Sequence, residues 1–302
     1  MSFNPAVITR NFPMKSVAYL RAANRFIICV LLVPALAAPS LLAQGRKKNP
    51  TSKIYVADVE GSAQIDTGET ITDLTKRSVY SAQGTVIETK EDATNAMVWS
   101  NGTGIYFDPS TRLEVKKFVQ EPFTPNRNDM EVEPSISNTE TYLSRGVIGL
   151  CTSKLVAGSS MNYNTPQASI RIKGRKAVIE VTAEGTKVSL IEGDVTVRAG
   201  SLDSGGQTIK PGQQALISPA GAIRIQSIPD NERQALDDKV TMACMARKTV
   251  YFDAQDKNET EEDVTAFDET GAESDQEIVA VEVTPSEVSP IITVSAATIP
   301  KP

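Results

Sequence analysis

Short runs of alternating apolar and polar residues fill the chain from about residue 53 to residue 228. Examples read IYVADVEG, GTVIETKE and QTIKPGQQALI, and β-branched residues dominate them. Clusters of Gly, Asn, Asp and Pro separate the runs. Alternation with a period of two, bounded by such turns, is typical of β-strands. No helical blocks lie between the strands, which argues against a doubly wound parallel sheet. The pattern predicts an all-β domain over residues 53–228.

Residues 229–253 break this pattern and predict one helix followed by a closing strand. The stretch NERQALDDKVTMACMARK follows Pro229, and Asp230 can cap its first turn. Acidic residues populate the first half, and Arg247 and Lys248 fall in the last turn, where they complement the helix dipole. Apolar residues recur at helical spacing. This stripe consists of Leu236, Val240, Ala243 and Cys244.

Two acids flank a glycine in KVSLIEGDVTV, where Glu192 and Asp194 surround Gly193. They are either an acid pair that does chemistry or a turn between two strands. A catalytic carboxylate pair must be held across a cleft, and nothing in the surrounding sequence indicates one. Glycine supplies the positive φ of a tight connection, and Asp tolerates turn geometry. We therefore predict a chain reversal at residues 192–194.

Other glycines predict further turns. Asn101-Gly102 in VWSNGTGIYFD is the strongest local hairpin signal. Pro211-Gly212 predicts a second turn, and Gly174 a turn or bulge. Trp99, Tyr106 and Phe107 flank the Asn-Gly turn. They could stack on a sugar ring, but cross-strand packing is the favoured interpretation. The basic group Arg171, Lys173, Arg175 and Lys176 surrounds Gly174, either as a solvated face or as a contact for the acidic tail or another anionic partner.

Residues 119–140, VQEPFTPNRNDMEVEPSISNTE, hold three prolines and few core residues. A connection this long is unusual in a compact domain. We interpret it as a linker or an excursion, with a binding loop as the alternative.

The N-terminus resembles an export signal, predicted over residues 1–43. FIICVLLVPALAA spans Phe26 to Ala38, follows two arginines and is too short to cross a bilayer comfortably. Cleavage is expected after Ala43, or alternatively after Ala37, and Met14 is an alternative start. An uncleaved anchor is the other interpretation. After removal of the leader, no segment is apolar enough to span a membrane, so we expect a periplasmic or extracellular protein.

Composition narrows the possible chemistry. The chain has no histidine, which removes the usual general base and the commonest metal ligand. Cys29 is lost with the leader, and Cys151 and Cys244 either form a disulfide or stay as buried thiols, with free thiols slightly favoured. No glycine-rich phosphate motif is present. We expect no enzyme and no catalytic, cofactor-binding or metal-binding residues, although carboxylate-only glycosidase chemistry remains open.

Charge is concentrated at the C-terminus. Thirteen acids and two lysines lie between Asp253 and Pro302, against a net charge of −6 for the whole chain. The rest of the mature chain is nearly neutral, which argues against a nucleic-acid partner. Residues 254–302 are predicted to be an acidic, disordered tail. Within it, EIVAVEVTPSEVSPIITVSAATIP alternates like a strand, so a loose strand or docking peptide is the alternative.

Several of these phrases together resemble the FecR-type domain family. GTVIETKEDATNAMVWSNGTGIYFDPSTRLEV is similar to its first half, and TPQASIRIKGRKAVIEV, TKVSLIEGDVTV and IKPGQQALI to its second. The match covers roughly residues 55–220. The resemblance implies a non-catalytic, all-β, short solenoid-like stack of strands. It further implies a domain outside the cytoplasmic membrane that receives a signal from an outer-membrane receptor.

We expect the chain to depart from that family, because the predicted cleavable leader lies where the anti-sigma segment and the membrane helix would be. Direct regulation of a sigma factor is therefore not expected. The favoured function is an exported, signalling-type module that binds an envelope protein through exposed strand edges or loops. A structural or polysaccharide-binding envelope component is the alternative, and a carboxylate-based glycosidase is a further one.

Overall fold

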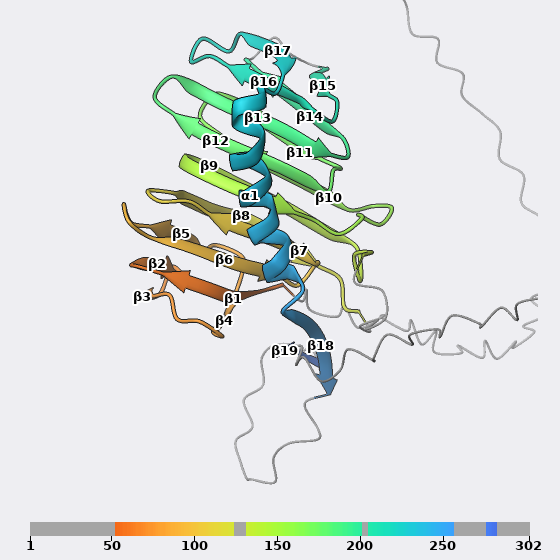
Figure 1. The fold of residues 1–302 in the computed structure, drawn as a ribbon. Coiled ribbons are helices and arrows are strands. Elements are labelled where there is room, and N and C mark those ends of the chain that lie inside the picture. The colour runs from red at the N-terminus through yellow and green to blue at the C-terminus, as the bar shows by residue number, and fades with distance from the viewer. Residues whose placement is uncertain (1–51, 124–130, 201–204, 257–275, 283–302) are drawn as a thin grey trace, which may run out of the picture. The chain divides into compact units, whose positions relative to one another are not determined.

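The structure is a computed structural model that describes residues 52–123, 131–200, 205–256 and 276–282. Two packed β-sheets and one helix, α1, make up most of this part of the chain (Figure 1). The strands stack along the sheets approximately in chain order, from orange to teal in Figure 1. The prediction of an all-β, stacked-strand domain with one C-terminal helix is therefore confirmed.

Sheet A carries α1 on its outer face, and every strand in it runs antiparallel to its neighbours. In order across the sheet, the strands are β4 (Val79–Ser81), β1 (Lys53–Glu60), β6 (Thr94–Trp99), β7 (Thr103–Phe107), β9 (Ser137–Cys151), β12 (Lys176–Thr182), β13 (Gly185–Glu192), β16 (Gln213–Ile217) and β17 (Ile223–Ser227).

Sheet B packs against the inner face of sheet A. Its strands in order are β3 (Ile71–Asp73), β2 (Ala63–Asp66), β5 (Val86–Thr89), β8 (Arg112–Gln120), β9, β10 (Ser160–Asn164), β11 (Ala168–Ile172), β14 (Val195–Ala199) and β15 (Gln207–Ile209). The pair β9–β10 is parallel, and the other pairs are antiparallel.

Strand β9 belongs to both sheets and bends between them at Gly146. Its first part pairs with β8 and β10 in sheet B, and its last part pairs with β7 and β12 in sheet A. Gly146 has φ 92°, and a Cβ at this position would lie 2.3 Å from Thr111 Oγ1. Only glycine fits this bend without moving the neighbouring chain.

The core between the sheets consists of the inward-facing half of each alternating strand. Trp99 and Phe107 are fully buried in it, and the ring of Trp99 stacks on Phe118 with centroids 5.1 Å apart. Tyr106 packs in a second cluster on the outer side, beside the end of α1. The aromatic residues around the Asn-Gly turn are thus packing residues, and sugar stacking on Trp99 or Phe107 is excluded.

The glycine phrases have two different roles. Asn101-Gly102 closes the β6–β7 hairpin, with Trp99 opposite Thr103 and Gly102 at φ 80°, as predicted. The turn predicted at residues 192–194 is present, with Gly193 at φ 102°, but it does not reverse the chain within one sheet: β13 pairs with β12 and β16, and β14 pairs with β11 and β15. Residues 192–194 instead form a corner that carries the chain from sheet A to sheet B.

The corners stack on one another through backbone contacts. Arg175 donates its N–H to Glu192 O at 2.9 Å, and Lys173 donates to Asp194 O at the same distance. A Cβ at Gly193 would lie 2.2 Å from the Cα of Gly174. Gly193 is therefore needed for the close approach of the two corners, and a Cβ at Gly174 would be tight, 3.0 Å from Glu192 O. Alternation along a single chain does not reveal this contact.

Helix α1 (Asp230–Arg247) lies across β6, β7, β9 and β12 (Figure 1). The predicted apolar stripe faces the sheet: Leu236, Val240 and Ala243 are buried there. The predicted cap is wrong. Pro229 occupies the N-cap position without a side-chain hydrogen bond, and Asp230 is the first helical residue and pairs with Arg233 at 2.9 Å.

A disulfide joins Cys151 on β9 to Cys244 on α1, so the slight preference for free thiols is wrong. Two glycines bring the helix close enough for this bond. A Cβ at Gly104 would lie 2.1 Å from Ala243 O, and one at Gly149 would lie 2.7 Å from Lys239 O. The helix backbone therefore rests directly on the strands.

The C-terminal segments also differ from the prediction. The strand after α1, β18 (Val250–Asp256), pairs with β19 (Gln276–Glu282) rather than closing the main sheets. Residues 276–282 of the predicted disordered tail are thus a strand, as the loose-strand alternative expects. Tyr55 Oη donates to Glu282 Oε1 at 2.7 Å, which ties β19 to β1. The tail segments 257–275 and 283–302 lie outside the described residues.

The connection predicted over residues 119–140 is shorter in the structure. Strand β8 continues to Gln120, and β9 begins at Ser137. Between them, Val132 forms a parallel bridge with Lys154. The predicted leader and its cleavage sites fall on residues that the structure does not describe. In the described part, no helix has the length and apolar character that a membrane crossing needs.

Candidate functional site

A polar groove of about 760 Å³ lies on the outer face of sheet B, across β10, β11, β14 and β15. These strands alternate, so Tyr163, Ile170 and Val197 enter the core while their neighbours face outward. The outward residues on β10 and β11 include Asn162 and Arg171, which lie opposite each other in the ladder.

Three cations and two carboxylates line this groove. The cations are Arg171, Lys173 and Arg198, and the carboxylates are Glu140 and Asp194. Glu140 Oε1 accepts a hydrogen bond from Asn164 Nδ2 at 3.1 Å. Within the described residues, neither Arg171 nor Lys173 forms an ion pair. The groove therefore offers positive charge beside amide and hydroxyl groups.

The basic group predicted around Gly174 is divided between two surfaces. Arg171 and Lys173 face the groove, whereas Lys176 Nζ lies 2.9 Å from Glu192 Oε2 and Arg175 Nε lies 3.8 Å from Glu192 Oε1. Arg175 also pairs with Glu131. The hydrogen bond from Lys176, with the charges of Lys176 and Arg175, lowers the pKa of Glu192.

The two acids of the Glu192-Gly193-Asp194 corner consequently do not share a site. Glu192 is held by cations at the end of sheet A, and Asp194 lines the groove on sheet B. Asp194 instead shares that groove with Glu140, a residue that sequence reasoning did not single out. The described residues contain no cluster of three or more potential metal ligands.

Three cations on the other half of the outer face of sheet B contact one carboxylate, Glu88. Glu88 lies 2.8 Å from Arg112, 3.2 Å from Arg145 and 3.2 Å from Lys90. Burial raises the pKa of Glu88, but the hydrogen bonds from Arg112 and Lys90 outweigh that effect, so the net pKa is lowered. These three cations therefore share one carboxylate partner, whereas Arg171 and Lys173 in the groove form no ion pair within the described residues.

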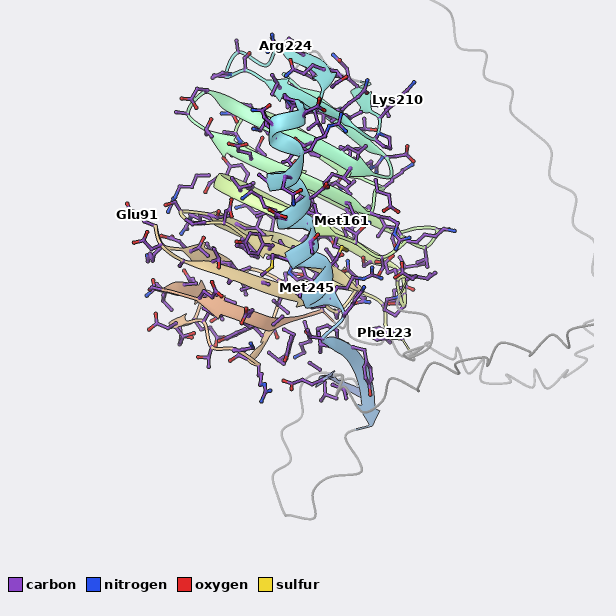
Figure 2. All side chains as sticks on the ribbon, viewed as in Figure 1. Glu91, Phe123, Met161, Lys210, Arg224 and Met245 are labelled. Carbon is purple, nitrogen blue, oxygen red and sulfur yellow. A yellow bond between two sulfur atoms is a disulfide. The ribbon has the colours of Figure 1, made fainter. Side chains whose placement is uncertain are left out.

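An exposed edge ends the stack at β17. This strand pairs only with β16 among the described residues, so one side of its backbone has no ladder partner. Ile223 and Ile225 pack partly against the core, and Arg224 is exposed at this end of the stack (Figure 2). The strands at the other sheet ends, β3, β4 and β15, each have three residues, whereas β17 has five.

A second groove, of about 500 Å³, is lined by the ends of the β12–β13 and β16–β17 hairpins and reaches the start of β17. Leu216 and Ile223 contribute apolar surface, and Lys187 lies on the side toward α1. Lys187 Nζ is 2.7 Å from Glu180 and 3.3 Å from Glu232 on the helix. Burial lowers the pKa of Lys187, but these two carboxylates outweigh it and raise the net pKa.

A buried polar network surrounds Glu133 in the connection before β9. Glu133 is 2% exposed. It accepts hydrogen bonds from Ser137 Oγ and from the Val156 N–H at 3.2 Å. Asn101 of the hairpin turn donates to Ser137 Oγ at 3.2 Å, so the network joins the turn to β9. Burial raises the pKa of Glu133 although these hydrogen bonds oppose it.

The sequence pattern located the strands that carry the groove and the β17 edge. It did not show which strands lie side by side to form the groove, or that β17 lies at the end of a sheet. Alternating polar residues on three strands, as in Asn162 and Asn164, were a usable signal for the groove. Glu133 gave no such signal, because it lies in an irregular, proline-rich segment whose burial depends on chain folding.

No family model matches the chain, and no curated protein matches it. Two crystal structures of a candidate anti-sigma factor from Parabacteroides distasonis ATCC 8503, at 2.50 and 1.65 Å resolution, are similar to part of it. The first has 14% identity and a TM-score of 0.38, covering 50% of this chain and 62% of the other. The second has 15% identity and a TM-score of 0.37, covering 50% and 63%. The chain thus spans less than two thirds of that protein.

Proposed function

We propose that this chain acts after export as a FecR-like binding module, without catalytic residues of its own. An envelope protein would add a strand to the β17 edge. The phrases that resemble the FecR-type family support the first part of this proposal. They fall on β5–β8 and on β11–β16, which are consecutive runs of the stack.

The edge of β17 is the observation that carries the proposal. Ser218 donates its N–H to Ala222 O, and Ile228 donates to Gly212 O, at either end of the β16–β17 ladder. Because antiparallel pairs alternate between bonded and non-bonded positions, the N–H groups of Ile223, Ile225 and Ser227 face away from β16. An extended segment of a partner can pair with these groups.

Natural edge strands are often blocked by proline, lysine or an inward charge. Strand β17 reads IRIQS and contains only one charged residue, Arg224. The groove at the start of β17, where Leu216 and Ile223 supply apolar surface, offers a place for a side chain of an added strand. This combination favours strand addition over contact by a flexible loop.

Ile225→Pro tests the proposal, because proline removes the outward N–H at the centre of the edge without removing a bond to β16. Wild-type protein should capture a saturable partner from envelope extracts, identified by mass spectrometry, and Ile225→Pro should lose it. Ile225→Val is the matched control, since it keeps both the N–H and a β-branched side chain.

Ser227→Pro provides a second variant at an exposed position, in case Ile225→Pro lowers stability through lost packing. The partner should also slow hydrogen exchange at the amides of residues 223–227. Equal capture by the proline and valine variants would contradict strand addition. Self-association of the purified chain that is lost in Ile225→Pro would also contradict the proposal. The strand added at the β17 edge would then come from a second copy of this chain.

A further inference from the structure

Ion pairs are unevenly distributed over the outer face of sheet B. On β8, Arg112 pairs with Glu88 and Lys116 pairs with Glu114. On β11 and the corner that follows it, Arg171 and Lys173 have no ion pair within the described residues, and both line the polar groove. Unpaired cations in a groove attract anionic groups.

The same groove presents uncharged hydrogen-bonding groups in a regular arrangement. Asn162, Thr196 and Thr208 lie in one row with Arg171, because the ladder places each residue opposite the next. Neighbouring strands are about 4.8 Å apart. A polymer that crosses the strands therefore meets a hydrogen-bonding group at every step: the amide of Asn162, the guanidinium of Arg171 and the hydroxyls of Thr196 and Thr208.

The lining of the groove contains no aliphatic or aromatic side chain among the described residues. Protein partners are usually held by buried aromatic or aliphatic anchors. A surface of amides, hydroxyls and cations instead fits a ligand that is rich in hydroxyl groups and carries negative charge. This argument favours a carbohydrate over an acidic peptide.

We propose that the polar groove binds an acidic polysaccharide. The carboxylates of the polymer pair with Arg171 and Lys173, and its hydroxyl groups bond to Asn162, Thr196 and Thr208. Arginine can hold a carboxylate through two parallel hydrogen bonds. The inference rests on the proposed export, but it uses a different face from the β17 edge, so either can fail without the other.

Polygalacturonate is a suitable probe, since its methyl ester keeps the backbone and removes the charge. Affinity electrophoresis and titration calorimetry with the full mature chain should show binding to polygalacturonate and at least tenfold weaker binding to the ester. Binding should weaken as salt is raised from about 50 to 500 mM, because exposed ion pairs are screened.

The double variant Arg171→Gln/Lys173→Gln should weaken binding by about tenfold or more, since a charge-assisted hydrogen bond is worth at least that factor. The variant Lys76→Gln/Lys116→Gln makes the same charge change outside the groove and should leave binding unchanged. Thermal unfolding of both variants checks that the fold is retained. The salt dependence of the wild-type protein tests the proposal even if the groove variant is unstable.

Five outcomes would overturn the proposal. The first four are equal binding of the methyl ester, equally tight binding of poly-L-glutamate, equal weakening in the Lys76/Lys116 control, and no binding to polygalacturonate at low salt. Shortening of the polymer during incubation would show catalysis by the groove, where Glu140 and Asp194 both lie, and would also overturn non-catalytic binding. Loss of binding in the groove variant with partner capture intact would separate this site from the β17 edge.

Discussion

At the scale of single residues, Glu133 makes stability depend on pH. Its carboxylate is buried without an ion-pair partner among the described residues, and burial raises its pKa above the ordinary value of 4.5. The folded state therefore holds a proton that the unfolded state releases. Stability contributed by this group is lost as pH rises from about 4.5 through the raised pKa.

Glu133→Gln removes this dependence. We expect the free energy of unfolding of the variant, relative to wild type, to increase as the pH is raised from 4 to 7. Urea denaturation at a series of pH values measures the difference. Glu192→Gln is the opposing control, because Lys176 lowers the pKa of Glu192 and that carboxylate stabilises the fold once ionised. A difference for Glu133→Gln that is flat or falls with pH would contradict the assignment.

At the scale of elements, two glycines decide where α1 lies. Gly104 and Gly149 have ordinary φ angles, so alanine is excluded only by the helix backbone above them. Gly104→Ala should force the helix away from β7 and cost about 1–3 kcal/mol, which is typical of overpacking. Chemical denaturation provides the measurement.

Gly205→Ala is the matched control for this substitution. No heavy atom lies within 4 Å of a Cβ built at Gly205, and its φ is ordinary. Its free energy of unfolding should be unchanged or slightly higher, since alanine restricts the unfolded chain. Equal losses in both variants would mean that backbone entropy, and not helix contact, explains the effect.

The elements were more predictable than their connections. Alternation located the strands, and Asn101-Gly102 located a hairpin, because both signals depend on neighbours in the sequence. The same kind of glycine signal at Gly193 was misjudged as a reversal. At Gly193 the chain passes to the opposite sheet instead of returning to its own. The corner there packs against Gly174, which lies nineteen positions earlier in the sequence.

At the scale of the whole molecule, contacts between distant segments were the least predictable. Cys151 and Cys244 are 93 positions apart, and their pairing depends on how α1 crosses sheet A. The polar groove is assembled from β9 to β15 in the same way, although each polar position could be seen in its own strand. The pairing of β19 with β18 likewise depends on a partner twenty or more residues away.

The disulfide connects the fold to the proposed export. Disulfides persist in oxidising compartments and are rare in the cytosol. We expect protein isolated from the envelope fraction to react with a thiol reagent only after reduction, at both Cys151 and Cys244.

A version without the leader, kept in the cytosol, should react at both cysteines directly and lose about 2–5 kcal/mol of stability. Cys244→Ser should leave Cys151 reactive in either location. Reactive cysteines in wild-type protein from the envelope would contradict the helix–sheet bond, and recovery of the mature chain from the cytosol alone would contradict export.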